Sequence, residues 1–381
     1  MVRVAGNNST RRFQHGLYIF LLSIVLISSP VRAGQSEAWW VFLDRRDTSE
    51  EAYRQARTSL DENAVERRLR IRGEVIIEAD LPFHPDDLKS LQELGCAIRT
   101  QSRFLGAVSV ETTRAGGVEA IRALPHVKHV RPVATYHSVA ATSAVEALDA
   151  GAPADAGIAP GKRTNRYTAT DTASYGHAWN QINLIGAHLA HEDGYDGEGV
   201  RVGFLDSGFL NIDSHQAFDS LNIVGRFNAL DSSEVIDTHG HGTSVVSVAA
   251  GYDPYNLIGV APRMEVLLVR TEDASDEYPE EEDFWVAGLE WAEAHGADFI
   301  STSLGYSDWY GPADYDGNTA VTTIAADLAA ARGLLVVTSA GNRGLTNLGA
   351  PADGDSVLTV GGTDYHGEWV QFASTGPTAD G

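Results

Sequence analysis

The feature that most constrains the fold is a regular alternation of short apolar runs and helical patterns from about residue 175 onward. The apolar runs are rich in β-branched residues and bounded by turn residues; they cover 200–205, 266–269, 299–304 and 334–338. Helical patterns lie among them, over 241–250, 283–295 and 319–332. Strands that alternate with helices pair in parallel, with helices on both faces of the sheet. The sequence therefore predicts a doubly wound, mostly parallel α/β sheet.

A smaller unit is predicted ahead of this sheet, within residues 38–136. Its pattern indicates, in chain order, strand 38–43, helix 81–94, strands 96–100 and 104–110, helix 117–124 and strand 127–133. This order is typical of a ferredoxin-like α+β fold. The only cysteine, Cys96, has apolar neighbours that favour a core position over a reactive one. No polar cluster in this unit suggests catalysis.

The N-terminus has the pattern of a secretory signal peptide. Three arginines precede an apolar run over residues 17–27, and small residues near Ala33 offer a cleavage site. A membrane anchor is the alternative, but the run is shorter than the roughly 20 residues that span a bilayer. We therefore expect secretion to an extracellular or periplasmic location, with no stable membrane anchor.

A linker is expected between the two folded units, because residues 138–165 are rich in Ala, Ser, Gly, Asp and Pro without apolar periodicity. Such segments are exposed and are readily cut by proteases. The chain is therefore divided into a signal peptide 1–33, a small domain 34–137, a linker with a cleavage region 138–170 and an α/β domain 171–381.

Charge is distributed unevenly along the chain, whose formal net charge is −24. Residues 171–381 contain 33 acidic residues, 6 arginines and no lysine, whereas residues 1–170 contain 22 basic and 19 acidic residues. An acidic surface repels nucleic acid, which argues against that class of partner. Two interpretations of the asymmetry stay open: a surface suited to a salty environment, and docking of the basic half on the acidic half.

Three short motifs place polar side chains where predicted strands end or a helix begins. Asp206 ends the run 200–205, where a carboxylate could orient an imidazole. His241, in D-T-H-G-H-G-T-S, begins the helix 241–250, whose dipole lowers an imidazole pKa while a nearby aspartate opposes that shift. Asn342, in S-A-G-N, follows the run 334–338 and could aim its amide at an oxyanion. Each motif taken alone also fits a turn or a cap, and we interpret His239 as a turn residue or a solvent-facing neighbour.

Taken in order, D-S-G, H-G-T-x-V, S-x-S-L-G and A-G-N resemble the subtilisin-like serine peptidases over roughly residues 175–381. The N-terminal unit resembles the inhibitor-like propeptide of the same family. The resemblance implies that Asp206 is the orienting acid, His241 the general base and Asn342 the oxyanion donor. It also implies that the substrate backbone pairs with an edge formed by Ser303, Leu304 and Gly305. The stretch 372–377 looks like the segment that precedes the family's nucleophile.

The nucleophile itself is expected in a G-T-S-M-A-x-P motif after that segment, and this sequence does not contain one. The only G-T-S is 242–244, which belongs to the histidine motif. Ser244 lies three positions beyond His241 on the same helix, so its hydroxyl should point away from that imidazole. We therefore expect an incomplete sequence whose catalytic serine lies beyond Gly381, and a fragment that is inactive alone.

The predicted protein is a secreted serine endopeptidase made as a precursor, with protein or peptide substrates and its own propeptide as an intramolecular inhibitor. No cofactor is required and no metal ligands are assigned, since H-G-H is not followed by a zinc motif. Calcium could serve as a structural ion by the resemblance, although we interpret the acidic runs 280–283 and 314–316 as solvated loops. The alternative is a catalytically inactive relative that binds peptides along 303–305. A nucleotide-binding oxidoreductase is disfavoured, because G-x-G-x-x-G does not follow 200–205.

Overall fold

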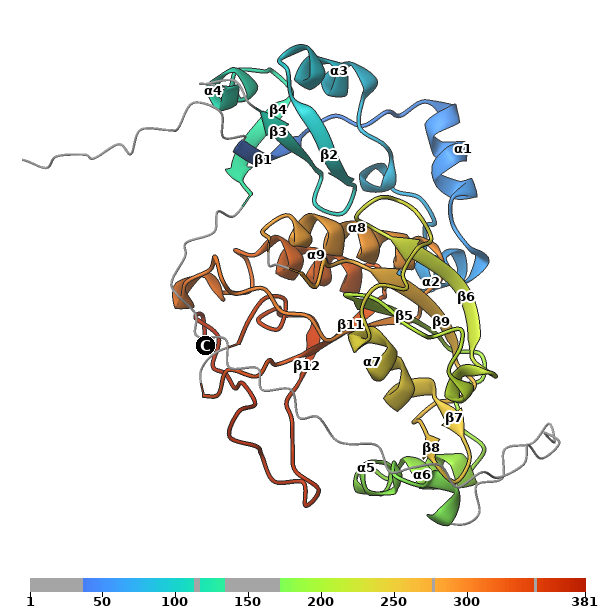
Figure 1. Ribbon diagram of the computed structural model, residues 1–381. Helices are drawn as coiled ribbons and strands as arrows, with labels where there is room; N and C mark the ends of the chain where they lie inside the picture. Colours follow the sequence, from blue (N-terminus) through green and yellow to red (C-terminus); the bar gives the residue numbers. More distant parts are fainter. Residues whose placement is uncertain (1–36, 113–116, 134–171, 276–277, 346–347) are drawn as a thin grey trace, which may run out of the picture. The chain divides into compact units, whose positions relative to one another are not determined.

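The computed structural model describes residues 37–112, 117–133, 172–275, 278–345 and 348–381, drawn in colour in Figure 1. The signal peptide predicted over 1–33 and the linker predicted over 138–170 lie outside the described residues. The boundaries of the four expected segments therefore stay predictions. Residues 36–381 form one compact unit by their mutual contacts.

The N-terminal part contains an antiparallel sheet with the strand order β2-β3-β1-β4. Its strands are β1 (Glu37–Leu43), β2 (Ala97–Ser102), β3 (Ala107–Thr112) and β4 (Val127–Pro132). The helices α3 (Pro85–Glu93) and α4 (Gly117–Arg122) connect them, and the buried side chains of Val41, Leu91 and Ile121 join helices and sheet in one core. The predicted ferredoxin-like arrangement is therefore present, and Cys96 is buried in the same core, as expected.

Two helices of this part were not predicted, α1 (Glu50–Thr58) and α2 (Glu62–Arg72). The buried side chains of α2 include Arg67 and Arg68, so the helix has no apolar stripe that a sequence pattern could reveal. The helix expected from residue 81 begins later, at Pro85, because the ring of His84 accepts the first free N–H group as an N-cap.

The C-terminal part is built on a six-stranded sheet with the order β12-β11-β10-β5-β9-β6. Every pair of neighbouring strands in it is parallel, as the alternation predicted. The strands are β5 (Arg201–Asp206), β6 (Asn222–Asn228), β9 (Glu265–Arg270), β10 (Phe299–Thr302), β11 (Leu335–Ser339) and β12 (Val357–Val360). The two edge strands, β6 and β12, were not predicted, because both are only partly buried. In addition, β6 contains polar residues, and β12 has only four residues.

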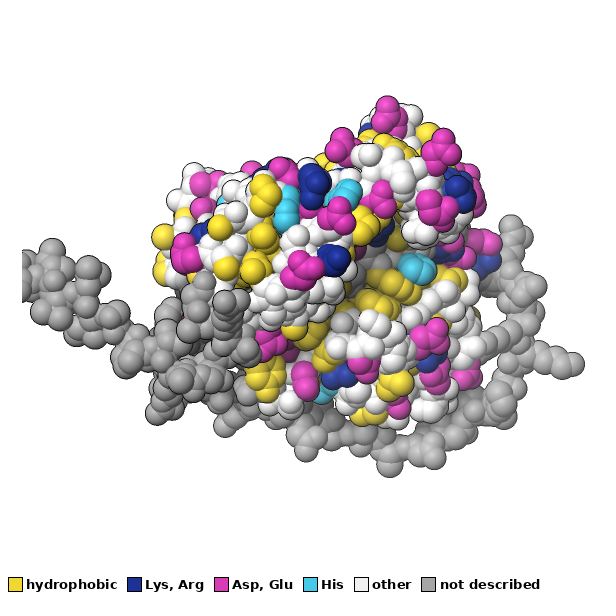
Figure 2. Space-filling model, turned by 90° about the horizontal axis from the view of Figure 1, so that it is seen from above, with side chains coloured by type: hydrophobic (Ala, Val, Ile, Leu, Met, Phe, Trp, Pro, Cys, Tyr) yellow, Lys and Arg dark blue, Asp and Glu magenta, His cyan; other side chains and the backbone are white. Residues whose placement is uncertain are grey.

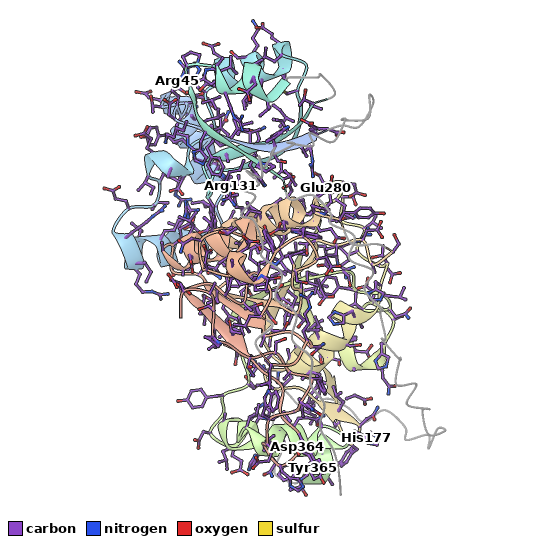
Figure 3. The ribbon with its side chains drawn as sticks, turned by 90° about the vertical axis from the view of Figure 1, so that its left-hand side faces the viewer. Arg45, Arg131, His177, Glu280, Asp364 and Tyr365 are labelled. Carbon is purple, nitrogen blue, oxygen red and sulfur yellow. The ribbon has the colours of Figure 1, made fainter. Side chains whose placement is uncertain are left out.

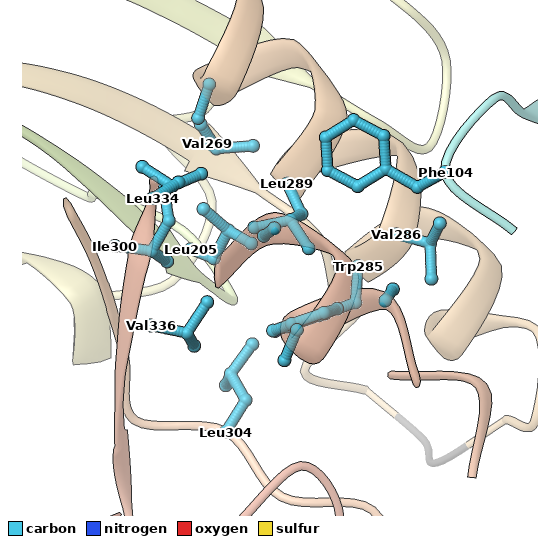
Figure 4. Close-up of a cluster of buried hydrophobic side chains, with 14 of the residues drawn as sticks. Phe104, Leu205, Val269, Trp285, Val286, Leu289, Ile300, Leu304, Leu334 and Val336 are labelled. Carbon is cyan, nitrogen blue, oxygen red and sulfur yellow. The ribbon is translucent and has the colours of Figure 1, made fainter. Parts of the chain in front are cut away.

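Helices cover both faces of this sheet, with α8 and α9 on one side and α7 on the other (Figure 1). They are α7 (His241–Ala250), α8 (Glu281–Ala294) and α9 (Val321–Ala330), each within three residues of its expected bounds. Alternate residues of β5 serve the two faces: Phe204 packs with Val246 of α7, whereas Leu205 packs with Leu289 of α8 (Figure 4). The doubly wound architecture is therefore confirmed.

The remaining elements are short. They are the helices α5 (Trp179–Leu184) and α6 (Ala187–Glu192), the strands β7 (Tyr252–Asp253) and β8 (Leu257–Ile258), and the 3-10 turns η1 (Glu78–Asp80), η2 (Thr172–Tyr175), η3 (Gln216–Phe218) and η4 (Pro312–Asp314). Among the described residues, no helix combines the length and apolar character needed to cross a membrane. On the face shown in Figure 2, side chains of both charge signs are interspersed.

The acidic run at the start of α8 is not the solvated loop that we expected. Its residues Glu281, Glu282 and Asp283 are at most 1% exposed and form the first turn of the helix. Glu282 accepts hydrogen bonds from Trp309, Tyr310 and Thr322 within the C-terminal part. The expectation failed because each carboxylate finds polar partners in the fold, which a charge count cannot show. The second run, 314–316, does lie in a partly exposed turn and loop.

The N-terminal part contacts α8 through buried polar pairs. Asp283 accepts from Ser109 of β3 at 2.5 Å and lies 2.9 Å from the guanidinium of Arg99. Glu290 accepts from the Ser102 hydroxyl at 2.5 Å. Figure 3 labels Glu280, immediately before α8, and Arg131 at the end of β4, whose guanidinium donates to the Thr319 carbonyl. Cations and hydroxyls of the N-terminal part therefore meet carboxylates of the C-terminal part, in line with the docking interpretation of the uneven charge.

The far end of α8 has a second set of such contacts, made by α2. Glu293 accepts from Arg67 at 2.7 Å and from both Nε and Nη2 of Arg68, at 2.8 and 2.6 Å. All three side chains are at most 2% exposed. Arg67 also donates to the main-chain oxygens of Glu293, in the last turn of α8, and of Ala297, which follows the helix.

Candidate active site

Asp206 is the last residue of β5, a central strand of the parallel sheet. As a whole residue it is 1% exposed, and its Oδ1 accepts the main-chain N–H of Ser207 at 2.8 Å. Ligands and reactive groups of doubly wound sheets gather at the carboxyl ends of the strands. Asp206 therefore lies where the sequence pattern placed it, held in a buried and hydrogen-bonded position.

His241 is the first residue of α7, and its Nδ1 lies 2.8 Å from Oδ1 of Asp206. A carboxylate only accepts hydrogen bonds, so Nδ1 carries the proton and Nε2 keeps its lone pair. The imidazole is 46% exposed, whereas the carboxylate is 2% exposed. One nitrogen is thus fixed by a buried anion, and the ring remains open to solvent. This geometry fits the roles expected from the sequence, with His241 as general base and Asp206 as orienting acid.

The pKa of His241 is raised, first by the hydrogen bond to Asp206 and then by the charge of that carboxylate, while burial lowers it. The sequence led us to expect a lowering by the helix dipole, opposed by the aspartate. The expected opposition by the aspartate is present, because its carboxylate contacts the imidazole directly at 2.8 Å and holds the imidazolium form.

Two glycines allow the aspartate loop and the histidine helix to approach this closely. A Cβ at Gly242 would lie 2.6 Å from the Gly208 carbonyl oxygen, 2.7 Å from the Phe209 ring and 2.9 Å from Cβ of Asp206. Gly208 has φ +147°, and a Cβ there would lie 2.4 Å from Oγ1 of Thr238. Glycine is therefore needed for steric reasons in both D-S-G and H-G-T, because any side chain there would separate Asp206 from His241.

A second histidine, His239, lies beside this pair. Its Nδ1 is 2.8 Å from Oγ of Ser207, and its ring is nearly parallel to that of His241, with centroids 6.4 Å apart. His239 is exposed, in agreement with the interpretation as a solvent-facing neighbour. Its hydrogen bond to Ser207 was not foreseen, because it depends on how the loops 207–211 and 237–240 cross. Ser244 donates to the Gly240 carbonyl at 3.2 Å within its own helix, consistent with the expectation that it is not a nucleophile.

Asn342 follows the carboxyl end of β11, which lies two strands from β5, and so it lies at the same edge of the sheet as Asp206. It is exposed, next to Gly341 with φ +99°. Ser374 secures this turn: its N–H donates to the Gly341 carbonyl at 2.9 Å, and its hydroxyl accepts from the N–H of Arg343 at 3.0 Å. The stretch expected to precede a nucleophile thus packs along the turn that carries the expected oxyanion donor.

The residues Ser303, Leu304 and Gly305 continue beyond the end of β10, at the same edge of the sheet. Leu304 is 7% exposed and packs into the core, whereas Gly305 is exposed. Among the described residues, no main-chain hydrogen bond is recorded for Leu304 or Gly305, and pairing resumes at Tyr306 with Ala350. The structure brings Asp206 and His241 into contact; it places Asn342 and this stretch at the same edge without recorded contacts to them.

Comparisons with known proteins match this geometry. A family model described as the subtilase family covers residues 197–381, and one described as the peptidase S8 propeptide domain of Bacteroidota covers residues 38–147. Subtilisin DY of Bacillus licheniformis is 34% identical over 201 residues, which are 51% of this chain and 68% of that protein. The chain belongs to the subtilase family.

Other relatives agree with this assignment. Subtilisin E of Bacillus subtilis is 32% identical to this subtilase over 209 residues, 52% of this chain and 50% of the relative. The chain thus spans half to about two thirds of the length of these relatives. The crystal structure of the epidermin leader peptide processing serine protease from Staphylococcus aureus shares the fold, with a TM-score of 0.54, 13% identity and coverage of 89% of this chain and 72% of that one.

Metal binding by this subtilase is not decided by its described side chains. Over the parts of the chain that the structure describes, His, Cys, Asp and Glu do not gather in groups of three or more that could hold an ion. The calcium expected from the family resemblance stays a prediction. The acidic run 280–283 is excluded as an open ion-binding loop, because three of its carboxylates are buried in the first turn of α8.

Proposed function

We propose that this subtilase is a serine endopeptidase that hydrolyses peptide bonds with an Asp–His–Ser triad. The observation that carries the proposal is the 2.8 Å hydrogen bond from Nδ1 of the half-exposed His241 to the buried Asp206. This pair leaves one basic nitrogen for a hydroxyl. The identity to subtilisins over about half of this chain supports the same reaction class.

In the proposed reaction, Nε2 of His241 takes the proton of a serine hydroxyl while the serine oxygen attacks the peptide carbonyl carbon. Asp206 stabilises the imidazolium that forms, and the Asn342 amide donates to the oxyanion. Collapse of the intermediate breaks the C–N bond, and the imidazolium gives its proton to the leaving amine. Water then hydrolyses the acyl-enzyme by the same steps. No described serine hydroxyl is recorded as a partner of His241, which is consistent with our proposal that the nucleophile lies outside the described residues.

We propose that the substrate is an extended peptide. The stretch Ser303–Gly305 leaves the sheet at the edge that carries Asp206, and main-chain groups of Leu304 and Gly305 have no recorded partner among the described residues. An extended chain could add to them as a strand through main-chain hydrogen bonds. Such binding uses groups that every residue has, which suits an endopeptidase with protein substrates.

We further propose that the N-terminal part is a propeptide that inhibits the peptidase in cis, and that the precursor is secreted. Support comes from the matching propeptide model and from the buried contacts of Arg67, Arg68 and Arg99 with carboxylates of α8. Cleavage in the linker expected over 138–170 would separate the two parts. Secretion rests on the signal-peptide pattern of residues 1–33, which lie outside the described structure.

The test is active-site labelling of the protein expressed together with its nucleophile-bearing segment. A fluorophosphonate probe should label the parent, and casein should be hydrolysed. His241→Ala and Asp206→Asn should abolish or strongly reduce both signals, whereas the control Ser244→Ala should retain them. Hydrolysis at the parent rate by either site variant would refute the proposal. A parent that binds peptides without labelling would instead support the catalytically inactive alternative.

A further inference from the structure

A continuous chain of hydrogen bonds connects the second histidine to the acid of the proposed triad. Nδ1 of His239 is 2.8 Å from Oγ of Ser207, and that hydroxyl is 3.3 Å from Oδ1 of Asp206. The same carboxylate oxygen accepts the N–H of Ser207 and Nδ1 of His241, each at 2.8 Å. His239 and His241 are therefore connected through Ser207 and Asp206, and only the two imidazoles reach solvent.

The hydroxyl of Ser207 has one proton, so it can serve only one of its two neighbours at a time. When Nδ1 of His239 carries a lone pair, the hydroxyl can donate to that nitrogen, and Oδ1 of Asp206 keeps two donors. When Nδ1 of His239 is protonated, it donates to Oγ, and the hydroxyl turns to Asp206 as a third donor. The protonation state of His239 thus decides how strongly the carboxylate of Asp206 is engaged.

We propose that His239 is a positioning residue for the base His241, acting through Ser207 and Asp206. Neutral His239 with its lone pair on Nδ1 accepts from Ser207 and leaves the carboxylate of Asp206 free to hold the imidazolium of His241. Protonated His239 adds a donor to that carboxylate and a positive charge 6.4 Å from the ring of His241, and both changes disfavour the imidazolium. The link to turnover rests on the proposed peptidase function, whereas the coupling between the two histidines does not.

The loops hold this arrangement in place. The N–H of Leu210 donates to the His239 carbonyl at 2.9 Å, and Oγ1 of Thr238 donates to the Ser207 carbonyl at 3.3 Å. A Cβ at Gly208 would lie 2.6 Å from the main-chain nitrogen of His239, so only glycine permits the crossing. Ser207 is 5% exposed, which keeps water from competing for its hydroxyl.

Other charged groups lie close to His239 in the sequence. Apart from Asp206 and His241, its own loop contains Asp237, whose carboxylate accepts the N–H of Asn211 at 2.7 Å. The charge of Asp237 also acts on Arg226, together with that of Glu234. Among the described residues, neither Asp237 nor Glu234 has a recorded hydrogen bond to His239, Ser207 or His241.

The experiment is an NMR titration of the full chain with ¹³C-labelled histidine Cε1, which follows His241 without requiring catalysis. In the parent, the signal of His241 should titrate over a broadened range, because its affinity for a proton depends on His239. In His239→Gln it should titrate as one simple group at a midpoint about 0.5 to 1 pH unit higher. The matched control His366→Gln, an exposed histidine outside the site, should leave the His241 curve unchanged.

Variants of Ser207 test the path. Ser207→Ala removes the hydroxyl and should weaken the coupling, and the conservative Ser207→Thr should restore it. An unchanged His241 curve in His239→Gln would overturn the proposal, and full coupling in a folded Ser207→Ala would overturn the route through the hydroxyl. In the complete enzyme, the acid limb of the pH dependence of kcat/KM should become a single ionisation in His239→Gln. Coupled titration in an inactive enzyme would refute the peptidase function and leave the coupling standing.

Discussion

Replacement of Glu293 by Gln should weaken the contact between α2 and α8 by an amount that the structure allows us to estimate. The carboxylate is fully buried and accepts three charged hydrogen bonds from Arg67 and Arg68. Gln keeps the size and one acceptor but removes the charge, so two buried guanidinium groups lose their anion. Removal of one partner from a buried pair costs about 3–5 kcal/mol. We expect the lower end, because Arg68 keeps Asp80 at 3.5 Å and Arg67 keeps two carbonyl oxygens.

The measurement is urea denaturation of the full chain, combined with hydrogen exchange resolved by peptide. About 3 kcal/mol corresponds to more than a hundredfold change in an equilibrium constant, so amides of α2 and of the C-terminal turn of α8 should exchange much faster. The matched control is Glu119→Gln, which removes the carboxylate of an exposed pair with Arg122 and should cost less than about 1 kcal/mol. If Glu293→Gln is no more destabilised than this control, the buried pair is not what holds α2 to α8.

The pH dependence of the same contact has a defined sign. Burial by itself would raise the pKa of Glu293, but the hydrogen bonds and charges of Arg68 and Arg67 lower it below its ordinary value. A depressed carboxyl pKa means that the contribution to stability is present at neutral pH and is lost as the pH falls through the folded-state pKa. Acid should therefore loosen α2 in the parent, whereas Glu293→Gln should show no such loss.

Four further changes have expected outcomes. Burial raises the pKa of Glu282 to about 7, although three hydrogen bonds to its carboxylate act to lower it. The contribution of Glu282 to the free energy of unfolding should therefore fall by roughly 3 kcal/mol as the pH rises from about 4.5 to 7. In Glu282→Gln, the midpoint of urea unfolding should no longer show this fall. Gly242→Ala should lower the free energy of unfolding by about 1–3 kcal/mol, because neighbouring atoms occupy the space that its Cβ needs. In the same assay, the control Gly240→Ala should lower it by less than about 1 kcal/mol, because the space around Gly240 is open. In the complete enzyme, Asp206→Asn should lower kcat by about 10⁴, a size known from serine peptidases. Asn342→Ala should lower kcat by about 10²–10³, a size known from subtilisin itself, and an unchanged kcat would remove Asn342 from the oxyanion site.

The central sheet and the acid–base pair could be predicted from sequence because their signals are local. A buried parallel strand such as β5 is a continuous apolar run, and Asp206 follows it directly. The helix α7 begins at His241, as expected, because the H-G-T motif opens an apolar segment. That the two side chains meet follows from the shared edge of a parallel sheet, which the alternation of strands and helices already implied.

The parts that sequence reasoning missed depend on contacts between distant segments. The hydrogen bond between His239 and Ser207 exists because two loops cross at Gly208, and no sequence pattern in either loop predicts it. The edge strands β6 and β12 have too little burial for an apolar pattern. The helix α2 buries arginines in place of leucines, so its sequence has the pattern of an exposed segment. For His239, Ser207 and the arginines of α2, the side chains are polar, and their contacts depend on a partner in another segment of the chain.

The polar character of α8 follows from the two states that the proposed maturation requires. Carboxylates at positions 283, 290 and 293 face the N-terminal part, and hydroxyls, main-chain N–H groups and arginines of that part contact them. Apolar residues at these positions could bind the N-terminal part at least as strongly, because buried ion pairs contribute little net stability. They would, however, leave an exposed apolar patch on α8 once the propeptide departs, and such patches promote aggregation. Carboxylates regain water instead. Charged side chains therefore suit a helix that is covered in the precursor and exposed in the mature enzyme. The same charged character, at the start of α8, led us to expect a solvated loop there.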